Sequence, residues 1–148
     1  MLLDRGAEIN AKNQCGITPL HIAVKSKKME FVELLVNQGA DVNARNGNNI
    51  TPLHLAVEQG SGKKTKLLLT RVANVDAKGK YGRSYIHIVT ERGYVQIVKL
   101  LLEYGANVDA QDKDGKSLLQ FAVEKGQENF VQLLLECGVN VDAQDKGW

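Results

Sequence analysis

The sequence predicts an all-α fold, a solenoid of stacked helix-turn-helix units that each carry a projecting hairpin. Two phrases return every 33 residues and lead to this prediction. The first phrase occurs as Thr18-Pro19-Leu20-His21, Thr51-Pro52-Leu53-His54, Ser84-Tyr85-Ile86-His87 and Ser117-Leu118-Leu119-Gln120. The second occurs as Gly39-Ala40-Asp41-Val42-Asn43-Ala44, with counterparts that begin at Gly6, Val72, Gly105 and Gly138. Because one unit of this length cannot bury its apolar face alone, neighbouring units must stack into a continuous core.

The first helix of the unit at residues 13–45 has a clear start signal. Gly16 lies in the preceding turn, where a left-handed backbone is wanted. Thr18 is expected to be the N-cap, and Pro19 occupies the first helical position, where its missing N–H costs nothing. The apolar face of this short helix is formed by Leu20, Ile22, Ala23 and Val24.

A second helix is expected from about Glu30 to Gln38, after a break near Lys27 and Lys28. Its apolar side chains are spaced to pack inward: Phe31, Val32, Leu34, Leu35 and Val36. Gly39 follows as a C-terminal cap. The segment 41–45 is expected to be extended and to lead into the next turn, which makes a hairpin that projects from the helices.

Together these motifs resemble the ankyrin repeat, in the period, in Thr-Pro-Leu-His and in the Gly-Ala-Asp-Val-Asn-Ala phrase. The resemblance covers four full units, 13–45, 46–78, 79–111 and 112–144, with the tail of a unit at 1–12 and the start of another at 145–148. It implies a single domain, 1–148: a curved stack with β-hairpin fingers and a concave face that binds other proteins. Since Met1–Gly6 align with Leu34–Gly39, we interpret the chain as a fragment of a longer array.

Composition is that of an ordinary globular protein, 43% hydrophobic and 24% charged. No apolar run approaches the roughly 20 residues that a bilayer span requires. A net charge of +2 is too small to indicate nucleic acid by itself. Cys15 and Cys137 fall at unrelated positions of the repeat, which fits a reducing compartment, and we expect an intracellular, cytoplasmic location.

Nothing in the sequence indicates catalysis, a metal or another cofactor, so a non-enzymatic protein is expected. His21, His54 and His87 share one slot of successive units, and we expect them to bond backbone or hydroxyl groups between repeats. The stretch 60–65, Gly-Ser-Gly-Lys-Lys-Thr, differs from a phosphate-binding loop because it lacks the earlier glycine and has Lys64 where Ser or Thr is needed.

Three asparagines allow two interpretations each. Asn49 begins a formal glycosylation motif, but it also fills the turn slot held elsewhere by glycine, where asparagine tolerates a left-handed backbone. In similar repeats the context of Asn10 and Asn43 can be hydroxylated by an oxygenase, which would make the chain a substrate at those positions.

The second unit is expected to be the weakest. Lys64 stands where the other units have Phe31, Ile97 and Phe130; Thr65 replaces a valine; and Val72 replaces the capping glycine. A lysine stem along the groove would recover part of the lost packing. The helix spanning 63–71 should therefore be the softest, as a tolerated defect or as a flexible joint used in binding. The apolar end faces predict weak end-to-end self-association.

The resemblance places partner contacts at the finger tips and on the outward side of each first helix. The finger residues that we predict to bind are Arg45, Ile50, Lys78, Lys80, Tyr81, Arg83, Lys113, Asp114 and Lys116; those of the helices are Glu58, Glu91, Arg92 and Lys125, and Glu124 occupies an equivalent helix slot. Six cations oppose one acid along the fingers, and Tyr81 adds an aromatic anchor.

This pattern predicts a protein partner with an acidic loop or peptide, gripped mainly by the second and third units. Binding of a polyanion such as RNA is the alternative, although a single tyrosine among the basic fingers is a poor base-stacking platform. A purely architectural spacer is the third possibility.

Overall fold

The computed structural model describes residues 8–71, 73–78 and 84–138. The chain divides into two compact units, Met1–Asn74 and Val75–Trp148. Each unit is described by itself. The predictions made for Val72, Lys80, Tyr81 and Arg83 concern positions outside the described residues.

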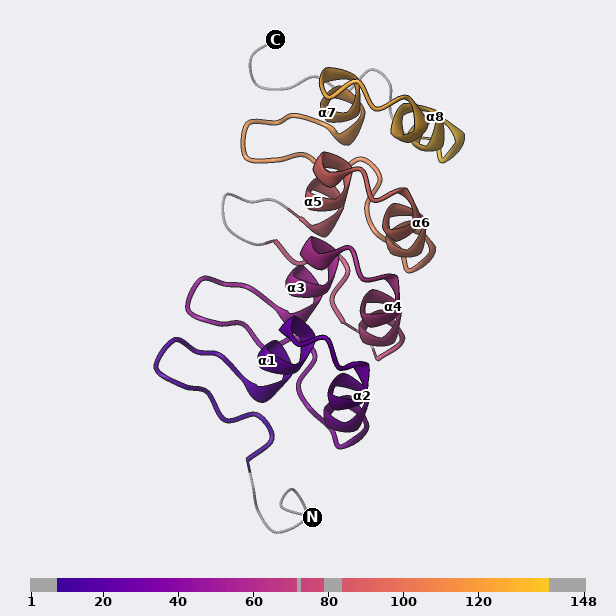
Figure 1. The fold of residues 1–148 in the computed structure, drawn as a ribbon. Coiled ribbons are helices and arrows are strands. Elements are labelled where there is room, and N and C mark those ends of the chain that lie inside the picture. Colours follow the sequence, from indigo (N-terminus) through magenta and orange to yellow (C-terminus); the bar gives the residue numbers. More distant parts are fainter. Residues whose placement is uncertain (1–7, 72, 79–83, 139–148) are drawn as a thin grey trace. The chain divides into compact units, whose positions relative to one another are not determined.

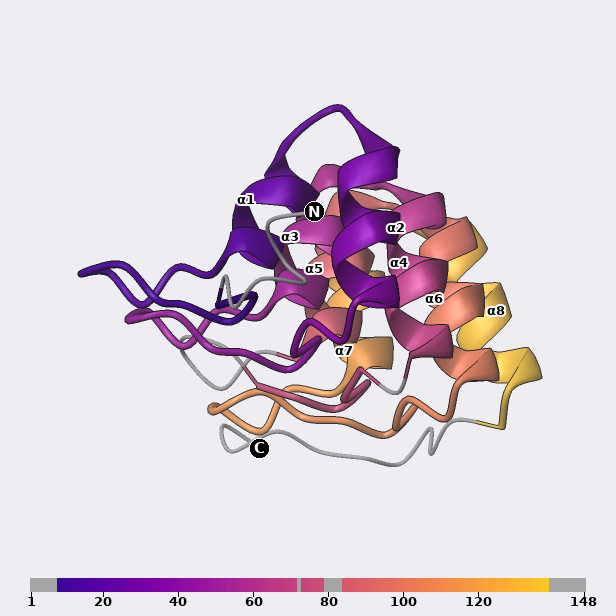
Figure 2. The same ribbon diagram turned by 90° about the horizontal axis from the view of Figure 1, so that it is seen from below.

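The first unit contains two helix pairs. Its helices are α1 (Pro19–Lys25), α2 (Met29–Asn37), α3 (Pro52–Gln59) and α4 (Gly62–Thr70). Helix α1 packs on α2 and on α3, and α4 packs on α3 and on α2. Within this unit α1 and α3 therefore form one layer and α2 and α4 form the other, while the connecting loops extend from the α1 side (Figures 1 and 2).

The second unit repeats this arrangement with α5 (Tyr85–Arg92), α6 (Val95–Glu103), α7 (Leu118–Glu124) and α8 (Glu128–Glu136). Contacts join α5 to α6, α7 to α8, and α5 to α7. The eight described helices and their order confirm the all-α repeat fold, and α2 begins and ends one residue before its predicted bounds.

A hydroxyl and an imidazole cap the N-terminus of the first helix of the repeat. The Thr18 N–H donates to His21 Nδ1 at 3.1 Å, and the His21 N–H donates to Thr18 Oγ1 at 3.4 Å. Since Nδ1 accepts, the ring proton sits on Nε2, which donates to the carbonyl of Ile50 in the next repeat at 2.9 Å. The predicted inter-repeat role of His21 is confirmed. Ser117 and Gln120 form the same box with an amide, whose Oε1 accepts from Ser117 N at 2.7 Å.

His54 makes the second repeat sensitive to acid. Burial, and then the charge of Arg45, lower the pKa of His54 from 6.5 to about 4. The unfolded chain therefore takes up this proton near pH 6.5, whereas the folded chain resists it until about pH 4. The stabilising effect of the neutral ring is complete above pH 6.5 and is lost as the pH falls from there towards 4.

We expect His54→Gln to flatten this acid dependence, because glutamine keeps the helix cap, as Gln120 does, without titrating. Between pH 7 and pH 4 the native chain should lose about 3 kcal/mol more of its free energy of unfolding than the variant. Urea unfolding across this range measures the difference. Parallel losses in the two proteins would show that His54 is not the group responsible.

The hairpin fingers differ from the prediction in two ways. The segment 41–45 is not extended, because Ala44 N donates to Asp41 O at 3.3 Å and closes a turn. The cause is the Asp41 side chain, which accepts from Asn43 N at 2.9 Å and so favours a turn over a strand. Among the described residues the fingers contain isolated bridges, Lys78 with Ser84 and Gln111 with Ser117, and no strand.

Close approach of the first two fingers requires a glycine. Gly47 N donates to Cys15 O at 2.8 Å. A Cβ on Gly16 would lie 2.9 Å from that same nitrogen, and Gly16 has a φ of +75°. The prediction of a left-handed Gly16 is confirmed, as is the left-handed Asn49, whose φ is +64°. Both positions need this backbone for the turn itself.

Inward packing of α2 is only partly as predicted. Val32 and Val36 are buried, but Phe31 is 49% exposed and Leu34 is also exposed, and on α1 the predicted core residue Ile22 is exposed as well. Phe130, at the position of Phe31 in the fourth repeat, is 1% exposed, because a preceding repeat can cover it. At the other end Val123 and Leu135 are exposed. The expected end-to-end association stays a prediction.

Lys64 is not the packing defect that the sequence suggested. Its side chain is buried, and Nζ donates to Val24 O and Ser26 O at 2.6 Å each and to Gln59 Oε1 at 3.1 Å. The C-terminal end of α1 explains why these hydrogen bonds from Lys64 are favourable. Lys27 stands where α3 and α5 have the left-handed caps Gly60 and Gly93. The ammonium of the second repeat satisfies carbonyls at a helix end that lacks this glycine.

Replacing Lys64 with methionine should lower the free energy of unfolding by about 1 to 2 kcal/mol. The loss of donors to the α1 carbonyls outweighs the relief of burying a charge, a burial that also lowers the pKa of Lys64. Chemical denaturation tests this, with Lys66→Met on the exposed face of α4 as the matched control. A more stable Lys64→Met variant would restore the original interpretation of Lys64 as a defect.

Thr65 does carry a cost. It is fully buried, and its Oγ1 finds no hydrogen-bond partner within the described ranges. A buried hydroxyl without a partner is unfavourable. The expected softness of α4 therefore rests on Thr65, and its use as a flexible joint remains a prediction.

We expect Thr65→Val to raise the free energy of unfolding by about 1 kcal/mol, because valine has nearly the same shape and no hydroxyl. Thr90→Val is the control, since Thr90 is equally buried but donates to Ile86 O at 2.7 Å. Denaturant midpoints should rise for the first variant and stay or fall for the second. Equal shifts would show that the missing partner is not the cause.

Candidate functional site

The tips of the fingers are shaped by a side chain that caps its own turn. Asn13 Oδ1 accepts from Cys15 N at 2.9 Å and from Ile17 N at 3.0 Å. Asn46 makes the same two bonds one repeat later, and Asp112 Oδ1 accepts from Asp114 N at 2.9 Å and from Lys116 N at 3.0 Å. Two bonds from one oxygen fix the turn and hold its outer side chains in defined directions.

In the second unit this turn forms one wall of a hollow of about 340 Å³, which we call the finger hollow. Glu91 at the end of α5 and the C-terminal half of α7 form the remainder of its lining. The finger hollow is lined by Glu91, Asp112, Lys113, Asp114, Lys116, Phe121, Glu124 and Lys125.

Charges of both signs alternate over the finger hollow. Lys116 Nζ lies 2.7 Å from Glu124 Oε2 and forms an ion pair with it. Lys125 Nζ lies 5.7 Å from the centre of the Phe121 ring, within cation–π range. The lining contains three ammonium groups, four carboxylates and one aromatic ring. An arrangement of this kind suits the recognition of a protein surface.

Five of the predicted contact residues meet in the finger hollow. They come from three separate segments: Glu91, Lys113, Asp114, Lys116 and Lys125. Arg92, also predicted, is exposed at the end of α5 but does not line it. Spacing within the repeat was therefore sufficient to bring together residues far apart in the chain.

The predicted residues of the first unit lie in other surroundings. Arg45 is half-buried and its Nη1 donates to Asn49 Oδ1 at 2.8 Å, so part of this cation supports its own finger. Ile50 is also half-buried, and its carbonyl accepts from His21. Glu58 is exposed near the end of α3.

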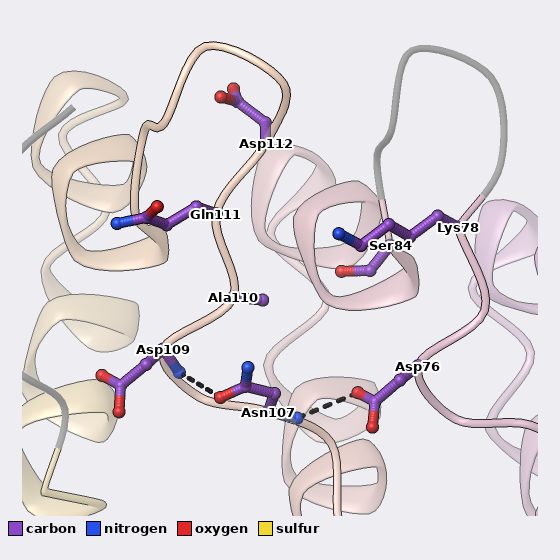
Figure 3. Close-up of a pocket in the computed structure, with 8 residues that line it drawn as sticks. All are labelled: Asp76, Lys78, Ser84, Asn107, Asp109, Ala110, Gln111 and Asp112. Carbon is purple, nitrogen blue, oxygen red and sulfur yellow. Dashed lines mark hydrogen bonds between the residues drawn. The ribbon is translucent and has the colours of Figure 1, made fainter. Parts of the chain in front are cut away.

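Lys78 lines a different hollow, of about 520 Å³, at the base of the fingers (Figure 3). Its lining is Asp76, Lys78, Ser84, Asn107, Asp109, Ala110, Gln111 and Asp112. Here Asn107 N donates to Asp76 Oδ1 at 3.0 Å, and Asp109 N donates to Asn107 Oδ1 at 2.9 Å (Figure 3).

These hydrogen bonds at the base of the fingers belong to a repeated pattern. Asp41 N donates to Asn10 Oδ1 at 2.8 Å, and Asn74 N donates to Asn43 Oδ1 at 2.7 Å, with the same separation of 31 residues that joins Asn107 to Asp76. The side chain of each repeat thus holds the backbone of the next. The first role of Asn10, Asn43 and Asp76 is structural, and modification of the two asparagines stays a prediction.

Asp112 and Phe121 were absent from the sequence prediction of the site. Asp112 had a usable signal, because Asn13, Asn46 and Asp112 share one slot and all three residues favour turns. Phe121 occupies the slot of Ile22, Leu55 and Ile88, so it looked like another core position. Only the structure shows that this ring is half-buried and reaches the hollow.

Comparison with known families agrees with this geometry. A model of the ankyrin repeats, three copies long, matches residues 1–79 and 65–145. The chain belongs to the ankyrin repeat family, whose repeats generally bind other proteins and are typically not enzymes. A search of curated proteins found no match.

Two further features bear on the kind of site. None of the helices within the described ranges is long and apolar enough to cross a membrane. In the same part of the chain, no three His, Cys, Asp or Glu side chains are grouped so that they could hold a metal ion.

Proposed function

We propose that this chain is a non-enzymatic module that grips an acidic loop or peptide of a partner protein. The contact surface consists of the finger tips and the outward ends of the first helices. The observation that carries the proposal is the finger hollow, where one finger loop and two first helices converge on one recess. A recess lined by charged groups and an aromatic ring can hold a short protein segment.

The charge arrangement favours a loop or peptide over a nucleic acid. Lys113 and Lys125 are exposed at the hollow and can meet carboxylates of a partner. A phosphate backbone needs a continuous basic track, because affinity grows with each phosphate that is neutralised. Here Glu91, Asp114 and Glu124 would interrupt such a track. The RNA alternative is therefore weaker than the protein partner.

The test is affinity capture with the native chain and with a Lys113→Glu, Lys125→Glu double variant. Proteins recognised by the finger hollow should be retained by the native chain and lost from the variant, because both exposed cations become repulsive to acidic groups. Lys66→Glu with Lys99→Glu is the matched control, since these two exposed lysines lie on α4 and α6 and the charge change is equal.

The outcomes separate the three candidate functions. Proteins retained equally by all three chains would contradict binding at the finger hollow. Capture that disappears after nuclease treatment would favour the polyanion alternative. If the native chain retains no protein above an unrelated control, the spacer interpretation holds.

A further inference from the structure

The ion pair between Lys116 and Glu124 occupies the part of the finger hollow where a partner carboxylate would bind. The side chain of Lys116 is 26% exposed and that of Glu124 is 55% exposed. Lys116 ends the finger loop, and its backbone N–H is fixed by Asp112 Oδ1 at 3.0 Å. The turn therefore fixes the backbone of Lys116, and the Lys116 side chain is less exposed than the Glu124 carboxylate at the end of its helix.

We propose that Glu124 is an internal competitor that stands in for the carboxylate of the partner and must be displaced when the partner binds. This inference rests on the proposed function, because it assumes that the partner brings acidic groups to the hollow. It assigns Glu124 a role in selectivity beyond that of a surface charge.

Glu124 is better placed to move than Asp112, another carboxylate of the finger hollow. Asp112 is bound to its turn by two backbone N–H groups through one oxygen, so it cannot leave without opening the finger. Glu124 is the last residue of α7, where the negative end of the helix dipole disfavours a carboxylate. Its attraction to Lys116 offsets this repulsion, and an exposed pair of this kind is weak enough to exchange.

Competition of this kind makes the hollow selective for clusters of acidic residues. A partner with one carboxylate exchanges it for Glu124 at Lys116 and gains little. A partner with several carboxylates also reaches Lys113 and Lys125, which line the same hollow. Such a partner gains contacts that Glu124 alone cannot reproduce.

The experiment measures the binding of a fluorescein-labelled peptide, in which glutamates alternate with glycines, by fluorescence anisotropy at low salt. We expect Glu124→Gln to bind the peptide about two- to fivefold more tightly than the native chain, because the competitor is gone. Glu103→Gln is the matched control: Glu103 is exposed, ends α6 as Glu124 ends α7, and does not line the hollow. A Lys116→Gln, Glu124→Gln double variant should lose the gain.

Each result tests either the competitor role of Glu124 or the recognition of acidic partners. If Glu103→Gln tightens binding as much as Glu124→Gln, only net charge matters and the competitor role of Glu124 is wrong. If the native chain and Glu124→Gln bind the peptide equally, the same conclusion follows, while recognition of acidic partners stands. If neither binds at millimolar protein, the acidic partner itself is wrong, and the inference about Glu124 is overturned with it.

Discussion

Burial between successive helix pairs is the constraint on which this structure depends. A pair such as α1 and α2 has too little apolar surface of its own, and within the first unit Val24 of α1 is fully buried because α3 of the next pair packs against α1. The hydrogen bonds follow the same direction along the chain. His21 reaches Ile50, and Asn43 reaches Asn74, each in the following repeat. Apolar packing and hydrogen bonding thus fix the same alignment of each repeat on the next.

That alignment also determines which residues stay at the surface. Core positions are occupied by neighbouring repeats, which leaves the finger turns and the ends of the first helices to display variable side chains. The turns are rigid because one Asx oxygen accepts two backbone N–H groups, as in Asp112. The finger hollow therefore combines a hydrogen-bonded turn with outer side chains that are not part of the core, a division typical of repeat proteins.

Much of this could be predicted from the sequence, because the signals were local and repeated. Helix starts followed from Thr18 and Pro19, and the positions of Lys113 and Lys116 in the finger turn indicated that they lie close together, as the hollow shows, while their role in binding stays a prediction. The failures concern groups whose environment comes from another repeat. Lys64 looked like a loss of packing until the structure showed its bonds to Val24 and Ser26, forty and thirty-eight residues earlier. The pairing of Lys116 with Glu124 lies within one repeat, but it depends on side-chain geometry that spacing does not reveal.

The bond from Lys64 to the end of α1 has a consequence for how such a chain can change over time. The first repeat lacks the glycine that normally closes this helix, and the second lacks the apolar residue that normally fills the slot of Lys64. Each departure makes sense only in the presence of the other. A duplication or exchange that moved one of these repeats alone would separate a buried cation from its acceptors. The first and second repeats should therefore be retained together, although repeats of this fold are in general interchangeable.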